Sequence, residues 1–515
     1  MSGDFDNLGL TLAPIRSAVP VWHARAGAER LRELCIAVAA KNGRLIALWG
    51  SDERSRAEGF ALHLVLAVNA SALWLTVTLP DDAPQYPDIS DVFFAANRMQ
   101  RAARDLVGIR STAADQRPWL RHAAWPADVF PLRRDAALGT AFANTVEAYP
   151  FVTVGGDGVH EIPVGPVHAG TIEPGHFRFS IVGEKVLRLE ERLGYTHKGI
   201  EKLFEGRDLA SGAQLAARVS GDSTVAYAWA YAMAVEGVAR LEPPSRGKWL
   251  RALVLERERI ANHLGDLGYL GNDGGLAFGL AQFMRLKEDV LRLNAEVFGH
   301  RYMMDYVVPG GTARNIGRHG CDALIAQCGA LEREVRILAD VYEDHAGLQD
   351  RFLACGRVGP ELARQLGIVG FAARASGQAM DLRTAPAFAP YDRLGVAIQL
   401  QGAGDVAARV AVRVGEVFES LRLVRAIVGD LPAGEVAAPL DTFAGRGLGL
   451  GRVEGWRGEI AIALESEGAL IRRCHAHDPS WQNWPALEHA VIGDIVPDFP
   501  LINKSFNLSY SGHDL

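Results

Sequence analysis

Long stretches of helical pattern dominate the chain from about Gly199 onward. Many of them carry Ala, Leu and Val on more than one face, which is typical of helices buried in a large bundle. The expected helical stretches are Gly212–Leu241, Arg246–Leu270, Leu276–Phe298, Cys321–His345 and Gly404–Ile427. The later part of the chain is therefore predicted to be a large, mainly helical domain.

The first 145 or so residues show a different pattern. Leu31, Leu34, Cys35 and Val38 recur at helical spacing, and Asn42-Gly43 ends that helix. We expect strands at Leu45–Trp49, Phe60–Val68 and Leu73–Leu79, followed by a helix at Asn97–Val107. This order predicts a compact α+β domain with an antiparallel sheet.

The expected fold class is therefore α+β, with two domains. Residues 1–145 form the small domain with the antiparallel sheet, and residues 146–515 form the large helical domain. A small β-hairpin region is expected at the start of the large domain, from the strand patterns at Phe177–Val182 and Lys185–Glu190.

Composition excludes several classes of protein. The chain has 54 Lys and Arg against 61 Asp and Glu, a formal charge of −7, which argues against a nucleic-acid partner. Its five cysteines have no paired spacing, so we expect a reducing compartment. We find no signal peptide, and the most apolar stretches, Phe60–Leu79 and Val225–Val235, are too interrupted or too short to span a membrane. Any membrane association is expected to come through partners.

Common cofactor motifs are missing from the sequence. Gly445–Gly451 has glycine at every second position, which differs from the dinucleotide fingerprint and favours a flexible loop. Cys474-His475-Ala476-His477 is a weak metal candidate, because adjacent ligands rarely reach one ion without strain. We expect buried structural thiols at Cys321 and Cys328.

Dispersed motifs carry a family resemblance over nearly the whole chain. The motifs are Gly165–Arg178, His197–Lys202, Ala234–Glu236, Glu256–Leu264, Pro309–Gly311, Arg374–Gly377, Asp381–Arg383 and Glu454–Glu459. They resemble the large subunit shared by respiratory complex I, where it forms the quinone site, and energy-converting [NiFe] hydrogenases. Tyr86–Phe93, Asn97–Gly108 and Pro131–Asp135 resemble the 30-kDa-type subunit of complex I. This fused order is typical of hydrogenase-3/4 and formate hydrogenlyase large subunits.

The resemblance also shows where this chain departs from active hydrogenases. Those enzymes hold nickel and iron with four thiolates, from R-x-C-G-x-C and D-P-C-x-x-C motifs. Here the motifs read Arg218-Val219-Ser220-Gly221-Asp222-Ser223 and Asp478-Pro479-Ser480-Trp481-Gln482-Asn483. Neutral hydroxyls and an amide cannot replace soft, strongly donating thiolates. We therefore expect no metal at Ser220, Ser223, Ser480 and Asn483.

Complex I reuses the same cavity for a quinone headgroup, flanked by a histidine and a tyrosine. His176 lies at the histidine position and is our candidate for both catalysis and quinone binding. The tyrosine position is Gly221, so the resemblance places the cavity there but without its second hydrogen-bond donor. His176 could equally be a strand histidine that bonds to a backbone carbonyl.

Four further residues are candidates through the resemblance. Glu201 matches a glutamate that relays protons in hydrogenases, although it could simply favour a helix N-terminus. His263 lies on a helix that comes close to the partner's cluster in the family, but with Glu256 and Arg259 it could form an ion-pair line. Arg374 and Asp381 belong to a segment that lines the cavity, or they form a structural salt bridge.

The resemblance implies a peripheral oxidoreductase subunit on the cytoplasmic side of the inner membrane. Its expected partners are a [4Fe–4S] small subunit similar to the one in complex I, and antiporter-like membrane subunits. No cofactor is expected on this chain alone. The quinone is expected as a substrate, and NAD(H) as an electron donor to the complex as a whole. The alternative is a scaffold or coupling subunit without catalysis.

Overall fold

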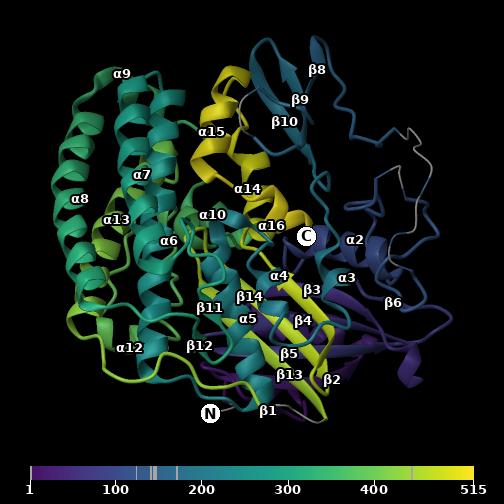
Figure 1. Ribbon diagram of the computed structural model, residues 1–515. Helices are drawn as coiled ribbons and strands as arrows, with labels where there is room; N and C mark the ends of the chain where they lie inside the picture. The colour runs from purple at the N-terminus through teal and green to yellow at the C-terminus, as the bar shows by residue number, and fades with distance from the viewer. Residues whose placement is uncertain are drawn as a thin grey trace.

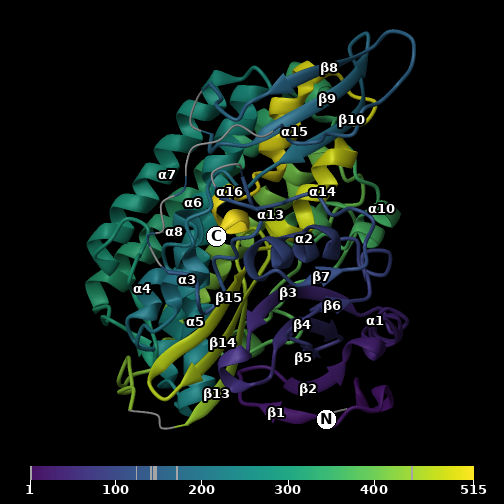
Figure 2. The same ribbon diagram turned by 90° about the vertical axis from the view of Figure 1, so that its right-hand side faces the viewer.

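The computed structural model of the chain describes residues 3–122, 125–137, 139, 142, 148–169, 172–441 and 445–515. Long helices gather on one side of the molecule, and the sheets lie on the other (Figure 1). The turned view places the N-terminal domain below and the small β8–β10 sheet at the opposite end (Figure 2). The predicted α+β class is confirmed. The predicted domain boundary at residues 145 and 146 lies outside the described residues.

A five-stranded sheet forms the core of the N-terminal domain, in the order β1-β2-β5-β4-β3. The predicted helices and three predicted strands are confirmed. The prediction of a purely antiparallel sheet is wrong in one place, because β2 and β5 pair in parallel. The chain leaves β2 through helix α1 and returns through the antiparallel β3–β4–β5 meander, which brings β5 beside β2 in the same direction. The elements of this domain are β1 (Ala13–Ile15), β2 (Val21–Gly27), α1 (Leu31–Ala39), β3 (Arg44–Asp52), β4 (Phe60–Val68), β5 (Ser71–Leu79), β6 (Gln85–Tyr86), α2 (Ala96–Val107) and β7 (Arg110–Ser111).

The large domain contains the predicted long helices, together with shorter ones. Helices α6, α7, α8 and α13 confirm four of the five expected stretches. The helices are α3 (Ile200–Phe204), α4 (Gly212–Ala216), α5 (Thr224–Ala239), α6 (Ser245–Asp273), α7 (Ala277–Phe298), α8 (Arg318–Asp344), α9 (Ala346–Phe352), α10 (Pro360–Leu366), α11 (Gly370–Ala375), α12 (Tyr391–Leu394), α13 (Val406–Gly429), α14 (Ser480–Ala490), α15 (Phe499–Phe506) and α16 (Tyr510–Asp514). None of the helices in the described part of the chain has the length and apolar character needed to cross a membrane.

The fifth expected helix, Gly212–Leu241, is broken. Helix α4 ends at Ala216, and α5 begins only at Thr224 after a short 3-10 turn at Gly221–Ser223. The N-terminus of α5 has a hydrogen-bond partner on α6. The buried side chain of Glu258 accepts hydrogen bonds from the backbone N–H groups of Val225 (2.7 Å) and Ala226 (3.2 Å). A carboxylate at a helix N-terminus satisfies free donors and is favoured by the helix dipole. The break therefore places Ser220–Ser223 in a turn.

The expected flexible loop at Gly445–Gly451 is wrong from Arg446 onward, where the chain forms strand β13. Strands β13 (Arg446–Glu454), β14 (Glu459–Glu467) and β15 (Leu470–His477) form an antiparallel sheet against helix α5. A Cβ atom on Gly449 or Gly451 would lie only 2.0 or 1.8 Å from the carbonyl oxygen of Ala234 or Ala230. Two residues of a strand span about 6.6 Å, which is close to the length of about 6 Å that four residues of a helix span. Glycines at every second position of β13 therefore lie against successive turns of α5.

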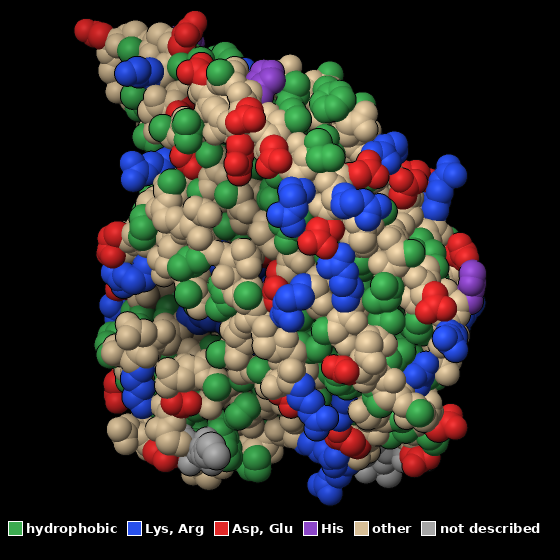
Figure 3. Space-filling model, turned by 90° about the vertical axis from the view of Figure 1, so that its left-hand side faces the viewer, with side chains coloured by type: hydrophobic (Ala, Val, Ile, Leu, Met, Phe, Trp, Pro, Cys, Tyr) green, Lys and Arg blue, Asp and Glu red, His purple; other side chains and the backbone are tan. Residues whose placement is uncertain are grey.

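Two smaller sheets belong to the large domain. The predicted hairpin is confirmed as β9 (His176–Val182) and β10 (Lys185–Arg192), and β8 (Val159–Val164) adds a third strand. The strands β11 (Val307–Val308) and β12 (Gly311–Thr312) form a short ladder. On the opposite side, helices α7 and α8 carry intermixed acidic and basic side chains (Figure 3), including the exposed pair Arg285–Glu334.

Candidate functional site

Two buried polar clusters lie in the core of the large domain. The first, which we call the ion network, contains charged side chains and one histidine from α6, α11, α13, β13 and the segment after α11. Its members are Glu256, Arg259, His263, Arg374, Asp381, Arg383, Glu416 and Glu454. Three arginines thus face four carboxylates, and all eight side chains are buried.

Helix α6 supplies one side of the ion network. Glu256, Arg259 and His263 follow one another at helical spacing on the face toward α13. Glu416 of α13 lies 3.2 Å from the Arg259 guanidinium and 2.9 Å from His263 Nε2. Burial lowers the pKa of His263, which keeps its ring neutral beside that carboxylate. The predicted ion-pair line on α6 is confirmed, and the His263 ring is enclosed by side chains of this chain.

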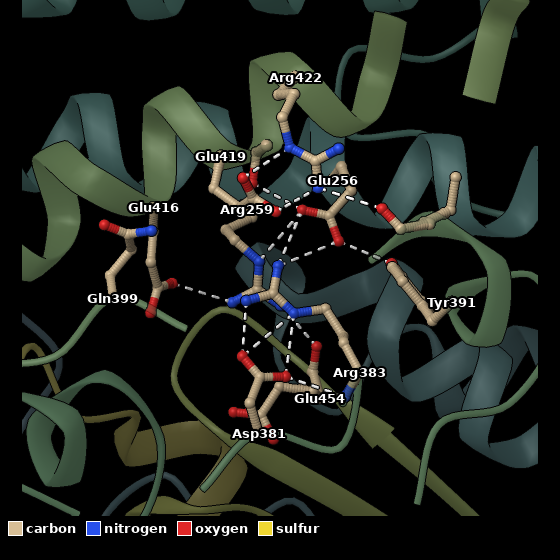
Figure 4. Close-up of polar contacts among 12 residues, drawn as sticks. Glu256, Arg259, Asp381, Arg383, Tyr391, Gln399, Glu416, Glu419, Arg422 and Glu454 are labelled. Atoms are coloured by element: carbon tan, nitrogen blue, oxygen red, sulfur yellow. Dashed lines mark hydrogen bonds and ion pairs between the residues drawn. The ribbon is translucent and has the colours of Figure 1, made fainter. Parts of the chain in front are cut away.

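Residues 374–383 supply the other side. The Arg374 guanidinium lies 2.8 Å from Glu416, 2.8 Å from Glu454 and 3.6 Å from Asp381. Asp381 also forms a 2.6 Å ion pair with Arg383, which reaches Glu256 at 3.1 Å. Figure 4 shows the Arg259 and Arg383 guanidinium groups between Glu256 on one side and Asp381 on the other. Arg374 and Asp381 therefore form the salt bridge that the sequence left open, within a larger network.

The network keeps most of its carboxylates ionised. Burial raises the pKa of Asp381, but the neighbouring Arg383 and Arg374 outweigh that effect and lower it to about 2. Burial also opposes ionisation of Glu416, yet Arg374, His263 and Arg259 hold its pKa well below the ordinary range. For Glu454, burial and the Asp381 charge raise the pKa. Glu454 is therefore the one carboxylate of the network whose pKa is raised.

The second cluster, which we call the serine cluster, consists of Ser220, Ser223, Ser480 and Ser509. Ser220 donates a hydrogen bond to Asp222 (2.7 Å), and its hydroxyl lies 2.9 Å from that of Ser509. The backbone N–H of Ser509 donates to the Ser480 hydroxyl at 2.9 Å. Ser220, Ser480 and Ser509, which lie far apart in the chain, are thus linked by short contacts between neutral groups.

An ion pair and a backbone contact border the serine cluster. Arg457 pairs with Asp222 at 2.5 Å and donates weakly to the Ser223 hydroxyl at 3.4 Å. The side-chain amide of Asn483 accepts from the N–H of Val369 (2.9 Å) and donates to its carbonyl (3.1 Å). The hydroxyls and the amide at all four positions therefore already have partners.

The two clusters share their supporting segments. Residues 454–457 carry Glu454 into the ion network and Arg457 to the edge of the serine cluster. Helix α6 places Arg259 in the network, while its Asn262 donates to the Asp222 carbonyl at 2.7 Å. Movement of either segment would therefore displace groups in both clusters.

Glu201 lies apart from both clusters, on α3 near the N-terminal sheet. Its carboxylate contacts His475 Nδ1 at 2.7 Å and the Arg473 guanidinium at 3.1 Å. Burial raises its pKa, but Arg473 and His475 lower it to about 2. The side chain does not cap α3, whose N-cap residue is Gly199. His475 also stacks on Trp49 of β3, with ring centres 4.7 Å apart, so this contact joins the two domains.

His176 lies at the start of β9 and lines a cavity of about 220 Å³. Its Nδ1 lies 3.1 Å from the carbonyl oxygen of Gly165, as expected for a strand histidine bonded to the backbone. Burial lowers the pKa of the ring. The cavity walls combine aromatic rings with histidine and arginine side chains: Pro118, Arg121, His122, Ala148, Tyr149, Pro150, Phe151, Arg192 and Tyr195. Gly221 is not among them, so the structure does not place it with His176 in this cavity, as the resemblance had led us to expect.

Comparison with known proteins identifies the family. Residues 24–141 match the 30 Kd subunit and residues 273–446 the 49 Kd subunit of respiratory-chain NADH dehydrogenase. The chain is 31% identical to formate hydrogenlyase subunit 5 of Escherichia coli (strain K12), over 92% of this chain and 85% of that protein. It is 32% identical to hydrogenase-4 component G of the same organism, over 92% and 84%.

The chain belongs to the complex I and group 4 hydrogenase large-subunit family. A solved structure agrees with this: a chain of the membrane-bound sulfane sulfur reductase, an archaeal respiratory membrane complex, matches with a TM-score of 0.66 and 25% identity, over 69% of this chain and 98% of that one. Relatives of this large subunit are oxidoreductase subunits of membrane complexes, and this chain is an oxidoreductase subunit of the same kind.

Nickel is the metal that the hydrogenase relatives suggest for this large subunit. The positions in question hold three hydroxyls and one amide, each hydrogen-bonded to neighbouring protein groups. Neutral oxygen and nitrogen donors of this kind do not fit a site that needs soft thiolates. Cys474, the cysteine next in sequence to this region, lies buried on β15. The residues present therefore do not fit a nickel centre.

Several members of these clusters were not among the sequence candidates. Glu416 accepts from two arginines and His263, yet it lies 153 residues from His263. A signal was present: Arg409, Arg413, Glu416 and Ser420 form a polar stripe at helical spacing along α13. Ser509 had no comparable signal, because a single serine near the C-terminus carries no pattern.

Proposed function

We propose that this chain is the nickel-free large subunit of a complex-I-like electron-transfer complex and helps to form its quinone site. The partner would be a small subunit that carries a [4Fe–4S] cluster, with antiporter-like subunits in the membrane below and the chain on the cytoplasmic side. NAD(H) would act as donor to the complex. The observation that carries the proposal is the contrast between an intact charged scaffold and a neutral serine cluster at the nickel positions.

The cavity beside His176 supports the choice of a quinone as acceptor. Reduction of a quinone to a quinol takes up two electrons and two protons, so its headgroup needs hydrogen-bonding groups in an apolar, partly closed space. His122, His176 and Tyr195 supply polar groups, while Tyr149 and Phe151 supply aromatic walls. A volume of about 220 Å³ suits a headgroup, and an isoprenoid tail would extend outside it. In this proposal the partner subunit completes the cavity and supplies the electrons.

The test is quinone reduction by the purified complex with His176→Ala. Loss of one hydrogen bond to the headgroup costs about 0.5–3 kcal/mol, so turnover should fall by a few-fold to about a hundredfold. His168→Ala is the matched control, because His168 also contacts a backbone carbonyl, at 2.7 Å, but does not line this cavity. Both variants should assemble with the small subunit.

Two results would contradict the proposal. An unchanged rate in the assembled His176→Ala complex would remove this residue and its cavity from the quinone site. A wild-type complex that contains its iron–sulfur clusters but reduces no quinone would instead favour the scaffold function.

A further inference from the structure

A trio of potential metal ligands lies away from both buried clusters. Among the residues that the structure describes, Cys355, Asp494 and Asp498 each offer a ligand atom within 4.8 Å of the others. Cys355 lies in the loop after α9, Asp494 follows α14, and Asp498 is the N-cap residue of α15 (Figure 1). Three separate segments of the chain therefore converge on one point.

The thiol at this point has no hydrogen-bond partner among the described residues. Cys355 is only 8% exposed, yet its sulfur lies beside two carboxylates rather than in an apolar pocket. One oxygen of Asp494 accepts from the N–H of Gly356 at 2.9 Å, and Asp498 pairs with Arg351 at 3.1 Å. Two carboxylates held this close repel each other, and a cation between them would remove that repulsion.

The backbone around the thiol is held by contacts outside the trio. The Cys355 carbonyl accepts from the N–H of Val406 at 3.0 Å, at the start of α13. The Ala354 N–H donates to Asp405 at 2.9 Å, and the Gly356 carbonyl accepts from Arg409 at 2.9 Å. Ligands on a fixed backbone need little reorganisation to bind an ion.

We propose that Cys355, Asp494 and Asp498 bind a divalent zinc ion, with water as a fourth ligand. One thiolate with two carboxylates is a mixed donor set that suits borderline-soft zinc better than magnesium or calcium, which prefer oxygen alone. Tetrahedral zinc needs sulfur and oxygen about 3.6 Å apart, given bonds of about 2.3 and 2.1 Å. Side-chain rotations that close the present spacing by about 1 Å are sufficient.

Binding releases one proton to solvent, because the Cys355 thiol becomes a thiolate when it binds the ion. Arg351, whose side chain is 41% exposed, can turn outward and leave Asp498 to the ion. The site would tie the loop after α9 to the start of α15. It is independent of the proposed quinone site, and its test does not use turnover.

The experiment uses the metal-free full chain and measures binding of zinc, and of cobalt as a spectroscopic probe. We expect one zinc per chain, a near-ultraviolet thiolate-to-cobalt charge-transfer band, and a higher unfolding temperature with zinc. Cys355→Ala should abolish the band, and Asp494→Asn should weaken zinc binding by about tenfold or more. Cys321→Ser is the matched control, because that thiol is only partly buried on α8 and would show any adventitious binding.

Arg351→Gln provides a test in the opposite direction. It removes the cation that competes for Asp498, so zinc should bind a few-fold more tightly while the metal-free chain stays folded. Equal zinc binding by wild type and a folded Cys355→Ala variant would overturn the proposal. The absence of the charge-transfer band from the wild-type cobalt complex would overturn the proposal as well. So would loss of the band in Cys321→Ser and its retention in Cys355→Ala.

Discussion

The ion network and the serine cluster share their supporting segments but are built from opposite kinds of side chain. The network pairs three arginines with four buried carboxylates, whereas the serine cluster joins neutral hydroxyls. Seven of the eight network residues lie in the motifs that carry the family resemblance, whereas Glu416 does not. The serine cluster includes three of the four positions at which that resemblance expects thiolates. The comparison suggests that the charged groups maintain the shape of the core, while the metal chemistry depends on a few replaceable ligands.

The largest effect should follow from removing a charge at the centre of the network. Arg374→Ala leaves Glu416, Glu454 and Asp381 without their shared cation. Breaking a buried ion pair in this way costs about 3–5 kcal/mol, so the unfolding free energy should fall by that amount, or the chain should not accumulate in folded form. Thermal and denaturant unfolding would measure the loss.

The matched control for Arg374 lies on the exposed face of α7. Arg285 pairs with Glu334, but both side chains are more than two-fifths exposed. Arg285→Ala should cost about 0–1 kcal/mol, because solvent screens such pairs. Equal losses for the two variants would contradict the distinction between buried and surface charges.

A smaller, pH-dependent effect should separate the two clusters. The pKa of Asp381 is lowered from 3.8 to about 2, so its ionised form stabilises the fold above pH 3.8, and this contribution is lost as the pH falls toward 2. Asp381→Asn should therefore be less stable near neutral pH, and about 2 kcal/mol of the difference from wild type should disappear in acid. Ser480→Ala should show no such convergence. Unfolding curves at several pH values would show whether the two variants differ in this way.

Within the two buried clusters, the smallest effect should come from the serine cluster at constant pH. Ser480→Ala removes the acceptor for the buried N–H of Ser509 and leaves a donor unsatisfied. We expect a loss of about 1–2 kcal/mol, measured by denaturant unfolding. A loss as large as that of Arg374→Ala would mean that the serine cluster, too, maintains the shape of the core.

The sequence predicted local structure well and long-range partners poorly. The spacing of apolar residues predicted α6, α7, α8 and α13 to within a few residues, because each helix buries its own faces. The glycines of β13 suggested a flexible loop, since their purpose becomes visible only when α5 lies against them. The break before α5 was missed for the same reason, because Glu258 of α6 provides the N-terminal partner.

In the candidate site, too, local motifs were predicted and long-range partners were missed. Arg374, Asp381 and His263 were predicted through family motifs, but Glu416, which contacts both Arg374 and His263, lies on a distant helix without a motif of its own. Ser220 and Ser480 were predicted as neighbours by resemblance, while Ser509, which contacts Ser220 through its hydroxyl and Ser480 through its backbone N–H, was not predicted. Contacts between residues hundreds of positions apart depend on the packing of whole elements, which one sequence does not reveal.

The central claim is that the serine cluster has replaced the metal centre, and the nickel content of the intact complex tests it most directly. The complex should be purified from cells grown with ample nickel and analysed for nickel, with the iron of its clusters as an internal standard. We expect nickel far below one atom per chain, because hydroxyls and an amide occupy the ligand positions. One nickel per chain would contradict the account.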